Sequence, residues 1–199
     1  LMNPLLTRLG VSPEIQAFFK VSVEIYFSYG DQEEHYSDGL HTVPATQNLW
    51  VAGSHNATHV IVTYSVMEAV AFITLNRHRY PRLEQLAFIA IGNRWCPEQG
   101  NWIRQNFKGR KFTLVFGKDL IGHITDIKVT AGIKNIAISV FHSENGIVIC
   151  RGSQSHIFNQ EQATLHAFQE AFGIRPRLRT GKPVQSLTFL EQLKYDAER

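Results

Sequence analysis

The sequence lacks the features that mark disulfide-rich and membrane-spanning proteins. It has only two cysteines among 199 residues, Cys96 and Cys150, and their separation fits neither a disulfide framework nor a zinc-binding CxxC pair. We therefore expect both thiols to be reduced and buried. No apolar run reaches the roughly 18 residues that a membrane span requires, and the first residues show no basic region followed by an apolar one. These absences predict a cytoplasmic protein that does not enter a membrane.

The sequence also has little excess charge of either sign. Its 20 Lys and Arg residues are nearly balanced by 17 Asp and Glu residues, which leaves a formal net charge of +3. Domains that bind nucleic acid are usually more basic as a whole, so the overall charge favours anionic partners only weakly. Apolar residues, in contrast, are plentiful at 44% of the chain. This proportion predicts a globular protein with one sizeable core and attached segments.

Short apolar runs alternate with helix-like segments from residue 58 onward, which indicates an α/β fold with a mainly parallel sheet. The first run, His59–Thr63, is rich in β-branched residues and passes directly into a helix predicted at Val66–Asn76. Ligands bind at the carboxyl ends of such strands, so Tyr64-Ser65 is expected at a ligand-binding edge. The other elements predicted in this region are a strand at Ala87–Ala90, a helix at Glu98–Phe107, a strand at Lys111–Phe116, a helix at Ile121–Ala131 and a strand at Asn135–Phe141.

Before this region, short patterns predict an α+β segment. Ser12-Pro13-Glu14 combines a capping hydroxyl, a proline in the first turn and an early acid, which is typical of a helix start. Val21–Gly30 alternates like a strand with one buried face. Asp31-Gln32-Glu33-Glu34 is expected to be a polar turn. His41–Val51 is expected to return as an antiparallel strand, at an edge or a bulge because it contains Pro44.

After this region, the pattern predicts an antiparallel extension and two helices. Asn145-Gly146 is typical of a two-residue hairpin turn between two apolar runs. A helix is expected at Asn159–Phe172, capped by Asn159 and ended by Gly173, and a shorter one at Ser186–Tyr195. The whole chain is thus predicted to consist of an N-terminal α+β lead-in over residues 1–56, a core over residues 57–142, and a C-terminal hairpin and helical extension over residues 143–199.

The strand ends of the core resemble the motifs of the TOPRIM domain, the Rossmann-like module of topoisomerases and bacterial primases. In that family the first strand ends in Glu-Gly and an apolar-acid pair follows, where this chain has Tyr64-Ser65 and Met67-Glu68. The third strand ends in Asp-x-Asp with a glycine soon after, where this chain has Gly117-Lys118-Asp119 and Gly122. The resemblance covers less than half of the chain. It implies a degenerate TOPRIM core, similar to primase-like proteins of plasmids and other mobile elements.

The resemblance also implies which catalytic positions have changed. The glutamate of the family is proposed to act as a general acid and base, and Tyr64 stands in its place with a phenol that is far less acidic. The first aspartate of the metal-binding pair is replaced by Gly117, which offers no side-chain ligand. Tyr64 is then expected either to fill the crevice or to stack on a base. These changes predict a degenerate active site without catalysis.

Two carboxylates remain at the positions that the family uses, and each has two interpretations. Asp119 and Glu68 could together hold one weakly bound Mg²⁺, since magnesium prefers oxygen ligands. Alternatively, Asp119 caps the helix that follows it, and Glu68 pairs with a cation such as Arg94 or Lys118. No other cofactor is indicated.

Clusters of Lys and Arg are the remaining sequence feature that bears on function. Lys and Arg neutralise phosphates without reading a base sequence, so these clusters could form a basic rim around the crevice of the sheet, and otherwise they are solvated loop residues. Arg77-His78-Arg79 and Arg82 would extend the same rim. The residues predicted to bind nucleic acid are Lys108, Arg110, Lys111, Lys118, Arg175, Arg177, Arg179 and Lys182.

Three functional hypotheses follow from the sequence. We favour a non-catalytic TOPRIM-like protein that binds DNA or RNA, or a protein partner in DNA processing. The first alternative is a Mg²⁺-dependent nuclease or nucleotidyl transferase of the primase-like type, whose missing acids come from elsewhere in the chain. The second alternative is a structural module for protein interaction.

Overall fold

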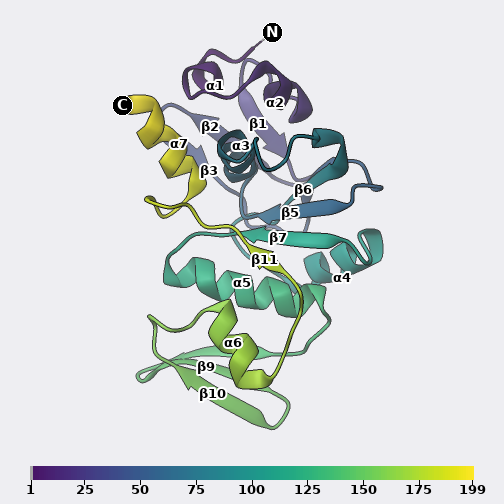
Figure 1. Ribbon diagram of the computed structural model, residues 1–199, viewed down its shortest axis with the longest axis vertical. Coiled ribbons are helices and arrows are strands. Elements are labelled where there is room, and N and C mark those ends of the chain that lie inside the picture. Colours follow the sequence, from purple (N-terminus) through teal and green to yellow (C-terminus); the bar gives the residue numbers. More distant parts are fainter. Residues whose placement is uncertain (1) are drawn as a thin grey trace.

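The computed structural model describes residues 2–199 and shows a mixed α/β protein built around a five-stranded sheet (Figure 1). The strand order is β11-β7-β5-β6-β4. Four strands run parallel, and β4 lies antiparallel to β6 at one edge. The predicted α/β class with parallel strands is therefore confirmed. The strands are β4 (Trp50–Gly53), β5 (His59–Thr63), β6 (Leu86–Ala90), β7 (Lys111–Val115) and β11 (Arg179–Thr180).

Helices cover both faces of this sheet. On one face lies α3 (Val66–Leu75), with α7 (Phe189–Glu198) packed against it. On the other face lie α4 (Pro97–Asn106) and α5 (Leu120–Ile133). The predicted strands and helices of this region match the observed ones to within one or two residues, apart from the final strand.

Alternation along the strands explains why the sheet has two apolar faces. The central strands are continuous apolar runs, and their side chains point alternately to opposite sides. Because both sides are covered, nearly every residue of β5, β6 and β7 is buried. Ile61, Phe88 and Val115 belong to the core beneath α3, whereas Val62, Ile89 and Leu114 belong to the core beneath α4 and α5.

The N-terminal elements form a separate three-stranded antiparallel sheet and two short helices at one end of the molecule (Figure 1). Ser12 caps the second helix as predicted. The expected strand at Val21–Gly30 is shorter than predicted, because Val23 is 75% exposed and lies outside it. These elements are α1 (Pro4–Arg8), α2 (Pro13–Phe18), β1 (Ile25–Ser28), β2 (Glu33–Ser37) and β3 (Leu40–Thr42).

Two further predictions for this segment are wrong. The expected polar turn at Asp31-Gln32-Glu33-Glu34 ends inside β2, which pairs with both β1 and β3. The strand expected at His41–Val51 is two strands in two different sheets, β3 and β4. Pro44 lies between them, where it has no N–H to offer a ladder, and its carbonyl oxygen accepts a hydrogen bond from the N–H of Asn93 at 2.7 Å. The chain crosses from the small sheet to the central sheet at this point.

Residues 139–172 form an antiparallel sheet at the opposite end of the molecule, covered by one helix (Figure 1). The predicted hairpin is confirmed, with Ser143 paired to Gly146. The predicted parallel strand at Asn135–Phe141 is wrong, because the strand begins only at Ser139 and pairs antiparallel to its successor. These elements are β8 (Ser139–Ser143), β9 (Gly146–Arg151), β10 (Gln154–Phe158) and α6 (Leu165–Phe172).

The start of α6 also differs from the prediction. The side chain of Asn159 accepts from the N–H of Gln162 in a turn, and Thr164 is the actual cap, accepting from the N–H of Ala167 at 3.2 Å. The end of the helix is as predicted, since Gly173 has a left-handed φ of 64°. The chain then returns to the central sheet as β11, which pairs with β7.

Cys96 and Cys150 are free thiols, as expected, although both are half-buried rather than buried. Within residues 2–199, no helix combines the length and the apolar character needed to cross a membrane. A short 3-10 helix at Leu83–Gln85 completes the secondary structure.

Candidate functional site

The carboxyl edge of the parallel strands is where the sequence predicted a site, and Tyr64 lies there between β5 and α3. Ser65 caps α3, since its hydroxyl accepts from the N–H of Glu68 at 3.0 Å. Thr63 fixes the same turn by donating its hydroxyl to the carbonyl of Ser65 at 2.6 Å. Burial, and then the nearby charge of Glu68, raise the pKa of Tyr64 well above the ordinary value of a phenol. The Tyr64 hydroxyl therefore stays protonated at neutral pH.

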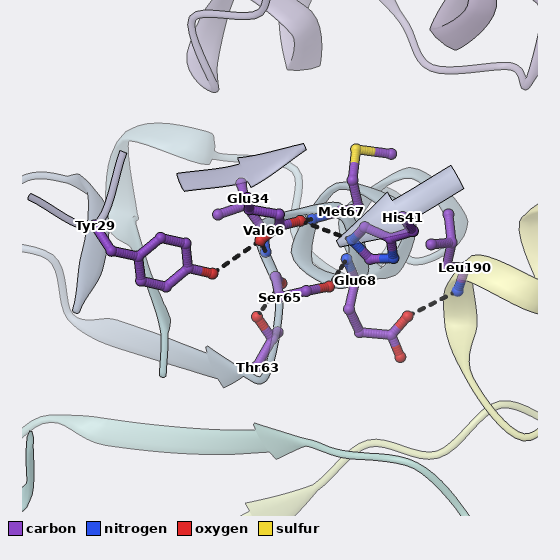
Figure 2. Close-up of polar contacts among 9 residues, drawn as sticks. All are labelled: Tyr29, Glu34, His41, Thr63, Ser65, Val66, Met67, Glu68 and Leu190. Atoms are coloured by element: carbon purple, nitrogen blue, oxygen red, sulfur yellow. Dashed lines mark hydrogen bonds and ion pairs between the residues drawn. The ribbon is translucent and has the colours of Figure 1, made fainter. Parts of the chain in front are cut away.

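The N-terminus of α3 is occupied by the carboxylate of Glu34, which the sequence analysis did not predict as part of a site. Glu34 comes from β2 and is fully buried. Its oxygens accept from the N–H groups of Val66 and Met67 at 2.7 and 3.0 Å (Figure 2). They are also bonded to the hydroxyl of Tyr29 at 2.8 Å and to Nε2 of His41 at 3.0 Å. A site that would favour a bound anion is thus filled by the protein itself.

Glu68 also caps a helix with its carboxylate, and this helix is α7. Its side chain is fully buried, and its two oxygens accept from the N–H groups of Phe189 and Leu190 at 2.9 and 2.8 Å. Figure 2 shows the bond from Leu190. These N–H groups belong to the first turn of α7. The suggested pairing with Arg94 or Lys118 is therefore wrong. Burial raises the pKa of Glu68 to about 7, even though the two N–H groups act in the opposite direction.

Asp119 caps α5, which confirms that interpretation of this residue. Its side chain accepts from the N–H of Gly122 at 2.8 Å. The turn is tight, because a Cβ atom on Gly122 would lie 1.9 Å from the carbonyl oxygen of Gly117. Lys118 points away to the C-terminal segment, where its ammonium donates to the carbonyl of Val184 at 3.1 Å.

An ion pair between Lys182 and the buried Asp126 lies at the carboxyl end of β7. The ammonium of Lys182 lies 2.7 Å from Oδ2 of Asp126 and also donates to the carbonyls of Phe116 and Gly117 at 2.8 and 2.9 Å. Nδ1 of His123 is 3.9 Å from the same carboxylate. Burial raises the pKa of Asp126 to about 6, against the opposing effect of Lys182. The charge of Lys182 is thus used within the fold.

The carboxyl edge therefore has its carboxylates committed to backbone groups or to a lysine. Glu34, Glu68 and Asp119 each cap a different helix, α3, α7 and α5. Among the residues that the structure describes, no group of three or more His, Cys, Asp or Glu side chains is arranged to hold a metal ion. The carboxylates of Glu34, Glu68 and Asp119 at this edge thus act as helix caps.

The predicted nucleic-acid-binding cations are distributed over both ends of the parallel strands. The strands finish at the carboxyl edge and begin at the opposite, amino edge of the sheet. Lys118 and Lys182 lie at the carboxyl edge, as described above. Arg175 and Arg177 are exposed in the segment between α6 and β11. The other four lie towards the amino end of β7 or on β11 beside it: Lys108, Arg110, Lys111 and Arg179.

An open cavity of about 840 Å³ lies at the amino edge. Its walls include Lys111 and Arg179 from the predicted set, and also Arg79 and Arg82 from the segment after α3. His59 at the start of β5 lines it as well. Arg110 is not among the residues that line it, and its guanidinium donates to the carbonyls of His55 and Lys108.

No protein-family model, no curated protein and no solved structure matches this chain. The resemblance to TOPRIM domains therefore remains a prediction from the residues at the strand ends.

Proposed function

We propose that the protein is a non-catalytic, TOPRIM-like nucleic-acid-binding protein, related to the primase-like proteins of plasmids and other mobile elements. The observation that carries the binding proposal is a set of cations at the amino edge of the sheet that form no ion pair within residues 2–199. Support for the absence of catalysis comes from the carboxyl edge, where Glu68 and Asp119 cap helices. Tyr64, at the position of the family's glutamate, has a raised pKa and holds its proton.

The cations of the amino edge are available to bind phosphates. Within residues 2–199, the side chains of Arg79, Arg82, Lys111 and Arg179 form no ion pair with a carboxylate. Like charges gathered around one cavity repel each other, and a polyanion would relieve that repulsion. Such contacts fix a nucleic-acid backbone without reading its sequence.

Binding of labelled single-stranded DNA and RNA over a salt series tests this function. The double variant Lys111→Ala/Arg179→Ala should bind more weakly, and its plot of log affinity against log salt should be shallower by about 1.4, because two phosphate contacts are lost. A matched control is Lys134→Ala/Arg151→Ala, which removes two exposed cations that do not line the cavity. This control should leave the slope unchanged.

Two results would contradict the proposal. Equal loss of binding in both double variants would mean that the amino edge is not the binding surface. Cleavage or nucleotide transfer that needs Mg²⁺ and is lost in Asp119→Ala would show an active enzyme of the nuclease or nucleotidyl-transferase type.

A further inference from the structure

The cavity at the amino edge is built from side chains that point to the same face of the sheet. His59 pairs in register with Lys111, and Thr113 pairs with Arg179. Residues paired in this way, and residues two apart along a strand, share a face, so all four lie on the side covered by α3. Because α3 ends at Leu75, this face is not covered by the helix at the amino edge, and the cavity opens there.

The charge of the cavity is entirely positive. Its cations are Arg79, Arg82, Lys111 and Arg179, and none of the lining residues in the described part of the chain is acidic. Burial, and then the charges of Arg179 and Lys111, lower the pKa of His59. His59 is thus neutral at pH 7, and its Nε2 lies 2.7 Å from the hydroxyl of Thr113. The arrangement concentrates positive charge without supplying a counter-ion.

An aromatic wall lies beside these cations. Tyr80 is half-buried, and its ring meets the ring of His59 edge-on at a centroid distance of 5.4 Å. The ring of Phe72 lies 5.7 Å from the same tyrosine. The main-chain carbonyl of Tyr80 accepts from the guanidinium of Arg77, so the backbone at this position is also held. A tyrosine fixed in this way offers a rigid surface for a planar ligand.

We propose that this cavity binds one nucleotide unit of a single strand, with its phosphate among Lys111, Arg179 and Arg79 and its base against Tyr80. The inference rests on the proposed function and specifies which part of a nucleic acid binds at the amino edge. Cavities that hold small ligands span roughly 300–1,000 Å³, and the volume of about 840 Å³ lies within this range. Cations alone would serve a free phosphate equally well, and the aromatic wall favours a nucleotide, because every base has a face that can stack.

Titration of the intact protein with AMP, UMP and inorganic phosphate, followed by NMR, tests the inference. Both nucleotides should shift the ring signals of Tyr80 and His59 at concentrations at least tenfold below those that phosphate requires. They should also raise the measured pKa of His59, because a bound anion offsets Arg179 and Lys111. Lys111→Ala/Arg179→Ala should weaken nucleotide binding at least tenfold, whereas Lys134→Ala/Arg151→Ala should leave it unchanged.

Tyr80→Leu separates the base contact from the phosphate contact. It should weaken binding of AMP several-fold and leave binding of phosphate unchanged. If the fold does not tolerate this change, the exposed Lys111→Ala/Arg179→Ala pair still tests the site, and near-ultraviolet circular dichroism verifies its fold.

The outcomes distinguish this inference from the function on which it rests. Salt-sensitive binding of labelled strands without any response of Tyr80 or His59 to nucleotides would overturn the inference and leave the function standing. Equal affinity for phosphate and AMP would also overturn it, since the aromatic wall would then add nothing. Failure of both strands and nucleotides to bind would remove the function and the inference together.

Discussion

The buried side chain of Glu34 connects residues of the N-terminal sheet with the start of α3. Four groups meet its carboxylate: two backbone N–H groups of α3, the hydroxyl of Tyr29 and the imidazole of His41. Burying a carboxylate lowers the stability of the fold unless its oxygens accept hydrogen bonds. Here each oxygen of Glu34 has two hydrogen-bond partners. Burial, and then the charge of Glu34, raise the pKa of Tyr29 far above its ordinary value. This residue joins the N-terminal sheet to the start of α3.

Replacing Glu34 by Ala should therefore be severely destabilising. The N–H groups of Val66 and Met67 would be left buried without acceptors, and unsatisfied buried partners of a charged group cost several kcal/mol together. We expect the free energy of unfolding in urea to fall by about 3 kcal/mol. The neighbouring Glu33→Ala should change it by less than about 1 kcal/mol, because Glu33 is exposed and its ion pair with His35 lies at the surface. Similar losses in both variants would contradict this role of Glu34.

Sequence reasoning could not have identified Glu34. Two adjacent glutamates in a polar stretch read as a turn, and only the pairing of β2 with β1 and β3 decides that one faces inward. Asp119 was predictable because its partner, the N–H of Gly122, lies three residues away. Glu68 was ambiguous, since its partners lie 121 and 122 residues further along the chain.

At the scale of elements, the turn from β7 into α5 depends on a glycine for steric reasons. Gly122 lies in the first turn of α5, and a Cβ atom there would overlap the carbonyl oxygen of Gly117 and lie 2.7 Å from its nitrogen. These neighbours are backbone atoms, so they cannot rotate away. The close approach lets Asp119 reach the N–H of Gly122 and start the helix.

Gly122→Ala should accordingly lower stability, although alanine favours helices in general. We expect the free energy of unfolding to fall by more than about 2 kcal/mol, in the range typical of an overpacked site. The adjacent Ile121→Ala is the control, because Ile121 is 75% exposed and its truncation should change stability by about 0.5 kcal/mol at most. Urea denaturation of the two variants provides the comparison. A neutral or stabilising Gly122→Ala would mean that the turn relaxes readily.

Elements with strong local patterns were the predictable part of this fold. β5 was predicted with the ends that the structure shows, because a β-branched run passes directly into a helix-like segment. β11 was missed, since two residues in a basic segment carry no periodic signal and only pairing with β7 makes them a strand. The shift of the α6 start from Asn159 to Thr164 arises because the two residues, five positions apart, cap different turns.

At the scale of the whole molecule, stability should depend on pH through Glu68. Burial raises its pKa in the folded state to about 7 from an ordinary value of 4.5. A group whose folded pKa is raised stabilises the protein at low pH, and this contribution is lost as pH rises from about 4.5 to about 7. Asp126, with its pKa raised to about 6, acts in the same direction over a lower range.

Urea denaturation of the wild-type protein and of Glu68→Gln between pH 4.5 and pH 8 tests this dependence. The variant does not titrate at this position, so the stability of the wild type relative to the variant should decrease with rising pH. The decrease should reach about 3 kcal/mol, since one pKa unit corresponds to about 1.4 kcal/mol. Parallel curves for the two proteins would show that Glu68 has the same pKa in the folded and unfolded states.

The late position of β11 and α7 in the chain has a consequence for biosynthesis. These elements supply an edge strand of the central sheet and the N–H groups that receive Glu68. While a ribosome is still making residues before 179, β7 lacks its outer neighbour and the carboxylate of Glu68 lacks its donors. We therefore expect the nascent chain to remain incompletely folded, and vulnerable to proteases, until the segment from Arg179 to Glu198 has left the exit tunnel.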